Sequence, residues 1–175
     1  MSDAPSPLPP AAIAQFLRAT LTALASELAA LPPPVLAWHP APGEWCVKEV
    51  LGHLIETETR GFAGRIRTIL ASPDPKLEPW DQEAVARARR DCEREVRALL
   101  GELATARQES VRLVEGLQEV DLARGGDHAG VGYLRVGDLL NEWVHHDRNH
   151  VRQILANVQA YVWPHMGNAQ RFTTG

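Results

Sequence analysis

The sequence has few cysteines, no long apolar run and no strong excess of either charge. Its 175 residues include two cysteines, Cys46 and Cys92, which are too few for a disulfide framework and favour a reducing cytoplasm. Eighteen basic residues against 22 acidic ones give a net charge of −4, which argues against a nucleic-acid-binding surface. No stretch is apolar enough to span a bilayer. We therefore expect a cytoplasmic protein that binds neither nucleic acid nor membrane.

The length and composition predict one domain. A chain of 175 residues matches a single globular unit, and 45% hydrophobic residues are enough to build its core. Residues 1–10 contain four prolines and little that can be buried, so we expect a flexible tail there and one domain over residues 11–175. The sequence contains no phosphate-binding loop, dinucleotide fingerprint or serine nucleophile motif.

Apolar residues recur at helical spacing along nearly the whole chain. Proline and glycine breaks divide this pattern into long stretches. Cys92 falls on the apolar stripe of the third stretch, where it is expected to pack in the core, and no alternating strand pattern is found. The pattern predicts an all-α four-helix bundle, in which the connections allow either antiparallel or crossover topology. The predicted helices span residues 11–31, 46–71, 81–117 and 136–161.

Histidines in the last predicted helix carry most of the functional information. At about 100° per residue, His150 lies about 20° from Trp143 and His146 about 60° from it, whereas His145 points to the opposite side. His146 and His150 therefore share the buried face, one turn apart, where two imidazoles can bind one ion. His53 lies at the edge of the apolar face of the second helix and is the candidate third ligand.

Three histidines would leave coordination positions open, which is the geometry of a catalytic rather than a structural metal site. Glu56 follows His53 by three residues and is a candidate ligand or general base, although a solvated position on the helix is the simpler interpretation. Asp147 is expected on the core side, where pairing with an arginine of another helix is favoured over a role in orienting a histidine. Trp38 and Trp45 are expected to plug the end of the bundle.

These residues and their surroundings resemble the DinB-like (DinB/YfiT-like) superfamily of metal-binding four-helix proteins. The resemblance rests on two blocks, Trp38 to Glu58 (WHPAPGEWCVKEVLGHLIETE) and His145 to Ile154 (HHDRNHVRQI). Cys46 stands where this family usually has a serine helix cap, which puts the start of the second helix in doubt. The resemblance implies an up-down-down-up bundle, frequent homodimers and one divalent transition metal, zinc or nickel, held by His53, His146 and His150.

The functional expectation is a metal-dependent enzyme that acts on a small molecule. The cation would activate a bound water, as in a hydrolase, or a low-molecular-weight thiol, as in the thiol-dependent transferases of the family. The thiol alternative comes from the resemblance alone. The competing interpretation is a non-catalytic bundle in which the histidines, or a metal that they hold, only join helices.

Overall fold

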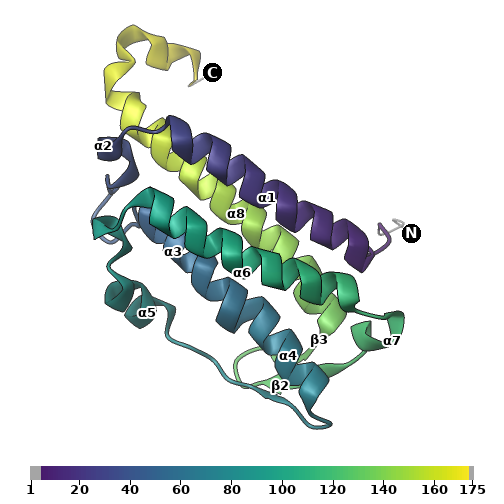
Figure 1. The fold of residues 1–175 in the computed structure, drawn as a ribbon. Coiled ribbons are helices and arrows are strands. Elements are labelled where there is room, and N and C mark those ends of the chain that lie inside the picture. The colour runs from purple at the N-terminus through teal and green to yellow at the C-terminus, as the bar shows by residue number, and fades with distance from the viewer. Residues whose placement is uncertain (1–4, 174–175) are drawn as a thin grey trace.

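Long helices dominate the computed structural model, which describes residues 5–173 (Figure 1). The first and last predicted helices are confirmed as α1 and α8, and the second is a continuous helical rod that contains a π-helical segment, η1. Pro10 already belongs to α1, whereas residues 1–4 of the predicted tail lie outside the described residues. The long elements are α1 (Pro10–Ala30), α3 (Val47–Glu56), η1 (Thr57–Phe62), α4 (Ala63–Ala71), α6 (Val96–Gly116) and α8 (Val136–Val162).

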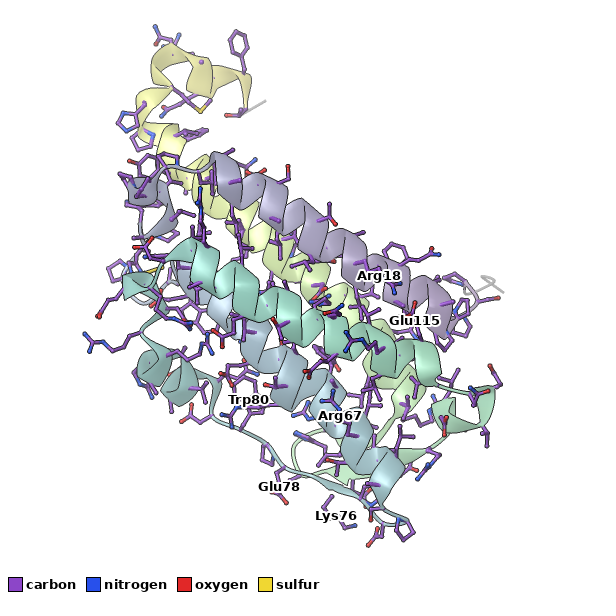
Figure 2. All side chains as sticks on the ribbon, viewed as in Figure 1. Arg18, Arg67, Lys76, Glu78, Trp80 and Glu115 are labelled. Atoms are coloured by element: carbon purple, nitrogen blue, oxygen red, sulfur yellow. A yellow bond between two sulfur atoms is a disulfide. The ribbon has the colours of Figure 1, made fainter. Side chains whose placement is uncertain are left out.

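The helices form an up-down-down-up bundle, as the resemblance implies. α1 packs against both α6 and α8, and α3 packs against the same two helices on the other side. α1 and α8 run in one direction, while α3, α4 and α6 run in the other (Figure 1). On the surface, an ion pair of 2.7 Å between Arg18 and Glu115 links α1 to α6 (Figure 2).

Apolar side chains from all four rods meet along the bundle axis in two clusters. Burial of these side chains supplies the main driving force for packing the helices together. One cluster lies toward α4 and the start of α8, and the other lies toward α3 and the C-terminal half of α1. Their fully buried members include Ile13, Leu17, Ile66, Leu139 and Trp143 in the first, and Leu24, Leu51, Leu54, Leu99 and Leu103 in the second.

The prediction of one continuous helix over 81–117 is wrong. The segment forms α5 (Gln82–Arg89), a single 3₁₀ turn η2 (Asp91–Glu93) and then α6. Arg90 adopts a left-handed conformation with φ 51°, and Asp91 turns inward, where it is 1% exposed and pairs with Arg89 and Arg94. Asp91 fits there because Gly52 has no side chain, and a Cβ at that position would overlap the Asp91 carboxylate. This break depends on contacts with α3, which helical periodicity does not encode.

The structure also contains short strands, which the apolar pattern of the sequence does not reveal. Three short strands, β1 (Lys76–Leu77), β2 (Gly125–His128) and β3 (Gly132–Arg135), form a small sheet in the order β1-β2-β3. β1 pairs with β2 in parallel, and β2 pairs with β3 as a hairpin whose turn ends at Gly132, with φ 80°. Strands this short cannot display an alternating apolar pattern, because two to four residues contain at most two alternations.

Cys46 and Cys92 form a disulfide, so the expected core packing of Cys92 is wrong. Cys46 is fully buried just before α3, and Cys92 lies in η2 rather than in a long helix. The argument for a cytoplasmic location from unpaired cysteines loses its basis, because disulfides are rare in that compartment.

The remaining described elements are short helices at the ends of the bundle. They are α2 (Pro33–Leu36), α7 (Glu119–Leu122), η3 (Trp163–His165) and η4 (Gly167–Phe172). Among all helices within residues 5–173, none has the length and apolarity needed to cross a membrane.

Candidate metal centre

Three imidazole rings from two helices converge inside the bundle. His53 lies near the end of α3, and His146 and His150 lie one turn apart on α8. One ligand nitrogen from each ring lies within 4.8 Å of the other two, and the Nε2 atoms of His53 and His146 are 3.0 Å apart. The ring centroids are 4.4 to 5.1 Å from one another. We call these three residues the histidine cluster.

The helices position these rings through their own apolar faces. α3 and α8 pack directly against each other, and Leu54 and Ile154, one residue after His53 and four after His150, are core residues. His146 follows the fully buried Trp143 by one turn, which keeps it on the inward side of α8. His145 is exposed, as the helical angle predicts. The helical spacing predicts that His146 and His150 share a face, the structure brings His53 to them, and the role of the three rings as ligands stays a prediction.

Burial keeps the histidine cluster uncharged. Burial, followed by the neighbouring His150 and His146, lowers the pKa of His53 to about 3. Burial, followed by His150 and Arg107, lowers the pKa of His146 to about 3, and burial lowers the pKa of His150 as well. Metal binding needs neutral imidazole with a free lone pair, so all three rings are in the ligand form at neutral pH.

The donor set fits a borderline transition-metal cation. His150 donates from Nδ1 to Gln153 Oε1 over 2.8 Å, which leaves its Nε2 lone pair available. His146 has one ring nitrogen toward His53, and its Nδ1 is buried without a hydrogen-bond partner among the described residues. Three neutral imidazoles at this spacing are the ligand set of open zinc sites, and they also suit nickel.

Aromatic side chains surround the rings. Trp45 lies 5.0 Å from His53 between ring centroids, Trp80 stacks on His53 at 6.2 Å, and Phe62 contacts His146 at 5.1 Å. Trp80 comes from the connection between β1 and α5 (Figure 2). Trp45 therefore borders the candidate centre, whereas Trp38 packs on Tyr161 at the end of the bundle. Nothing in the sequence around Trp80 pointed to this position.

Glu56 lies next to the histidine cluster but outside it. Its carboxylate binds Arg60 at 2.6 Å and Arg89 at 2.8 Å. Burial raises the pKa of Glu56, but the hydrogen bonds from the two arginines outweigh burial, so the pKa lies below its usual value. Glu56, His53 and Trp80 line one gap beneath α5, which has no room for a water molecule. The Glu56 carboxylate is ionised and lies close to His53. To act as a base, it would have to break one of its ion pairs with Arg60 and Arg89.

A second buried polar cluster lies beside the histidines and consists of Glu58, Arg107 and Asp147. Arg107 on α6 binds Asp147 at 2.6 Å and Glu58 at 2.6 Å, and Trp143 donates to Glu58 over 3.1 Å. The expected pairing of Asp147 with an arginine on another helix is thus confirmed. Burial raises the pKa of Glu58 to about 7. We call this group the ion cluster; Glu58 and Arg107 were not singled out in the sequence.

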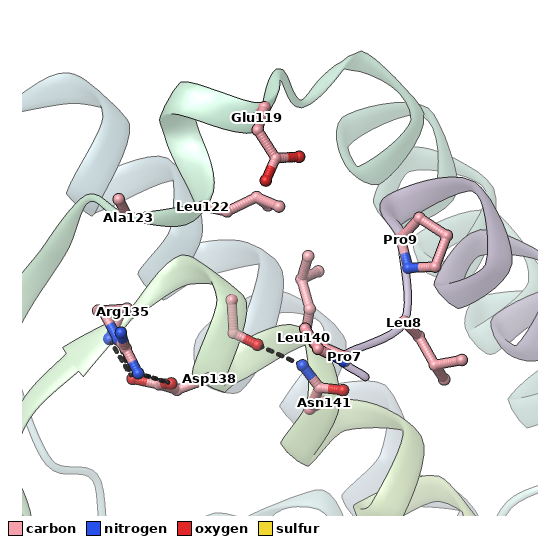
Figure 3. A pocket seen from close by; sticks show the side chains of 11 residues that line it. Pro7, Leu8, Pro9, Glu119, Leu122, Ala123, Arg135, Asp138, Leu140 and Asn141 are labelled. Atoms are coloured by element: carbon pink, nitrogen blue, oxygen red, sulfur yellow. Dashed lines mark hydrogen bonds and ion pairs between the residues drawn. The ribbon is translucent and has the colours of Figure 1, made fainter. Parts of the chain in front are cut away.

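Two surface hollows differ in their relation to the histidine cluster. A hollow of ≈ 410 Å³ between the start of α1, α7 and the start of α8 contains none of the three histidines (Figure 3). Another, of ≈ 530 Å³, is bordered by Trp45, which lies against His53, and by Gln153, which accepts a hydrogen bond from His150. This second hollow is thus lined by neighbours of the candidate centre, although none of the three histidines lines it either.

Comparison with known proteins yields a family and a fold. The DinB superfamily matches residues 15–154 of the chain. A solved structure, YfiT from Bacillus subtilis, described as a probable metal-dependent hydrolase with an unusual four-helix bundle topology, superposes with a TM-score of 0.80. The two chains are 18% identical, and the alignment covers 91% of each. No curated protein matches the chain.

Proposed function

The chain belongs to the DinB superfamily, and from this premise we propose that it is a metal-dependent hydrolase of a small molecule. The proposed ligands of its single divalent cation, zinc or nickel, are His53, His146 and His150. The observation that carries this proposal is the convergence of three neutral imidazoles from α3 and α8 within 4.8 Å. The description of YfiT as a probable metal-dependent hydrolase supports the same reaction class.

The surrounding residues prepare the histidines for this role. Gln153 fixes the orientation and proton position of His150, which is the usual task of a group behind a metal ligand. Trp45, Trp80 and Phe62 cover the rings and limit the entry of bulk water, which strengthens electrostatic interactions inside the site. The substrate enters by the hollow beside Trp45 and Gln153.

A divalent cation supplies Lewis acidity, which lowers the pKa of a water or thiol and presents a nucleophile at neutral pH. We propose Glu56 as the proton acceptor, because it is ionised and lines the same gap as His53. Glu56→Gln is expected to retain the metal and lose roughly 10²–10⁴-fold in kcat. Unchanged turnover in this variant would show that Glu56 is not the proton acceptor and serves only to pair with Arg60 and Arg89.

The decisive experiment is metal analysis of tag-free protein by mass spectrometry. Wild type is expected to contain one zinc or nickel ion at this site, and His146→Ala, His150→Ala to lose it. His145→Ala is the matched control, because it removes an exposed imidazole from the same helix. Circular dichroism checks that each variant is folded. Equal metal content in the double variant and wild type would contradict the proposal.

Activity screens separate the reaction classes. Turnover of activated esters supports hydrolysis, while turnover only with a thiol and an electrophile supports thiol transfer, and metal without either supports a binding or structural role. We also propose a homodimer, from the resemblance alone, and light scattering that shows a monomer at micromolar concentration would contradict the dimer.

A further inference from the structure

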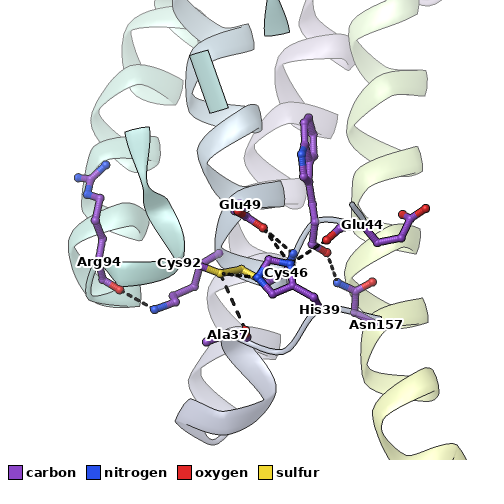
Figure 4. The surroundings of a disulfide bond; sticks show 10 residues. Ala37, His39, Glu44, Cys46, Glu49, Cys92, Arg94 and Asn157 are labelled. Carbon is purple, nitrogen blue, oxygen red and sulfur yellow. Dashed lines mark hydrogen bonds and ion pairs between the residues drawn. A yellow bond between two sulfur atoms is a disulfide. The ribbon is translucent and has the colours of Figure 1, made fainter. Parts of the chain in front are cut away.

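A second set of metal-ligating side chains gathers at the opposite end of α3. His39, Cys46, Glu49 and Cys92 each offer one ligand atom, and these four atoms lie within 4.8 Å of one another. The residues come from three separate segments: the connection before α3, the first turn of α3 and the turn η2 (Figure 4). None of them takes part in the histidine cluster, and the proposed function does not use them.

A disulfide accounts for two of these four side chains only. Cys46 and Cys92 are bonded, but the imidazole and the carboxylate that flank the sulfur atoms are not needed for that bond. His39 Nε2 lies 3.5 Å from Cys92 Sγ, and Glu49 Oε2 lies 3.5 Å from His39 Nδ1. Two sulfurs, one imidazole and one carboxylate together make a complete four-ligand set for zinc.

The orientation of His39 suits a ligand. Its Nδ1–H donates to the backbone carbonyl of Glu44 over 2.8 Å, so its Nε2 carries a lone pair, and that atom faces Cys92. A histidine that binds a metal typically donates its other ring N–H to such a carbonyl, which fixes the tautomer. The same arrangement brings no comparable benefit to an intact disulfide.

The start of α3 favours negative charge on the cysteine and the carboxylate. Cys46 immediately precedes α3, and its N–H donates to Glu49 Oε2 over 2.8 Å. The unpaired N–H groups and the dipole of a helix N-terminus stabilise nearby anions. Thiolate ligands select soft or borderline ions, so zinc is preferred over magnesium or calcium here.

We propose that the reduced chain binds one zinc ion through His39, Cys46, Glu49 and Cys92, and that the disulfide is the metal-free, oxidised form of this site. A dithiol reductant transfers two electrons and two protons to the disulfide and becomes a disulfide itself. The two thiols then release two protons as they bind zinc. In reverse, a hydroperoxide takes two electrons from the thiolates and, with two protons, becomes an alcohol and water while zinc departs.

In tetrahedral zinc sites the Zn–S distance is about 2.3 Å, which places two thiolates roughly 3.8 Å apart. The four ligand atoms already lie within 4.8 Å, so side-chain rotation is enough to reach this geometry. Four protein ligands leave no open position, so this zinc joins η2 to the start of α3 and has no catalytic role.

Cobalt binding to the wild-type protein tests this proposal. After reduction with a phosphine, which does not compete as a thiol, titration with Co²⁺ is expected to produce a thiolate-to-cobalt charge-transfer band. Three imidazoles cannot give that band, so the histidine cluster does not interfere. The oxidised protein and Cys46→Ser, Cys92→Ser should lack the band, and His165→Ala, which removes an exposed histidine elsewhere, should keep it.

Zinc content provides the second measurement. The reduced wild-type protein is expected to hold one zinc ion more per chain than the oxidised protein. Equal zinc content in both forms, or no charge-transfer band on reduction, would overturn the proposal. Either result says nothing against the histidine cluster, because an ion bound by the three histidines contributes equally to the zinc content of the reduced and the oxidised protein.

Discussion

The histidine cluster and the ion cluster lie next to each other in the bundle, yet they satisfy their polar atoms in different ways. In the ion cluster, Arg107 makes charge-assisted hydrogen bonds to two carboxylates and to the carbonyl of Leu17. In the histidine cluster, Nε2 of His53 and Nε2 of His146 meet at 3.0 Å, and Nδ1 of His146 is buried without a hydrogen-bond partner among the described residues. The first cluster therefore joins separate helices through opposite charges, while the second consists of neutral rings that offer lone pairs, as the proposed cation requires.

Removal of the Arg107 guanidinium from the ion cluster should have the largest effect on stability. Arg107→Ala leaves Glu58 and Asp147 buried without a counter-charge, so we expect a loss of about 3–5 kcal/mol in the free energy of unfolding. Urea denaturation measures this loss. Arg112→Ala, at an exposed position on the same helix, should change stability by less than about 0.5 kcal/mol. A similar result for both variants would show that the ion cluster does not hold the bundle together.

Added metal should stabilise the histidine cluster. Zinc or nickel at 100 times its Kd is expected to raise the free energy of unfolding by about 2.7 kcal/mol, because the ion binds the folded chain preferentially. The measurement is thermal unfolding of the oxidised protein, in which the cysteines are bonded. The gain should vanish in His146→Ala, His150→Ala, and a gain of equal size in that variant would place the stabilising ion elsewhere.

Acid should act on the two clusters with opposite signs. The pKa values of His53 and His146 fall from 6.5 to about 3 on folding, so the metal-free protein loses stability as the pH falls from 6.5 toward 3. The pKa of Glu58 rises from 4.5 to about 7, so its contribution is lost as the pH rises over that interval. We expect the histidines to lower the free energy of unfolding between about pH 7 and pH 4, and urea unfolding measures this change. A slope unchanged in His146→Ala, His150→Ala would contradict this assignment.

The smallest effect should come from neutralising one carboxylate of the ion cluster. Because Glu58 is half protonated near pH 7, Glu58→Gln should cost only about 1 kcal/mol, and the amide oxygen can still accept from Trp143. Asp147→Asn should cost more, since it weakens both hydrogen bonds from Arg107 to that carboxylate. Equal losses in urea unfolding would show that the two carboxylates carry the same charge.

The comparison also shows which features the sequence made predictable. Helical periodicity located α1 and α8, and it placed Trp143, His146 and Asp147 inward and His145 outward on α8. The same periodicity failed at Arg90, where Asp91 is drawn into the protein by Arg89, Arg94 and the space above Gly52. Short strands and the aromatic cover from Trp80 have no local signal either, because each depends on segments distant in the sequence.

The order of apolar and polar residues along the chain sets which face of each long helix is buried, and it places His146 and His150 on one face of α8. The packing of separate segments brings His53 to these two rings, joins Glu58 to Asp147 through Arg107, and puts Cys92 next to Cys46 beside His39. Local order acts through the backbone within a few residues, whereas these encounters depend on how separate rods pack.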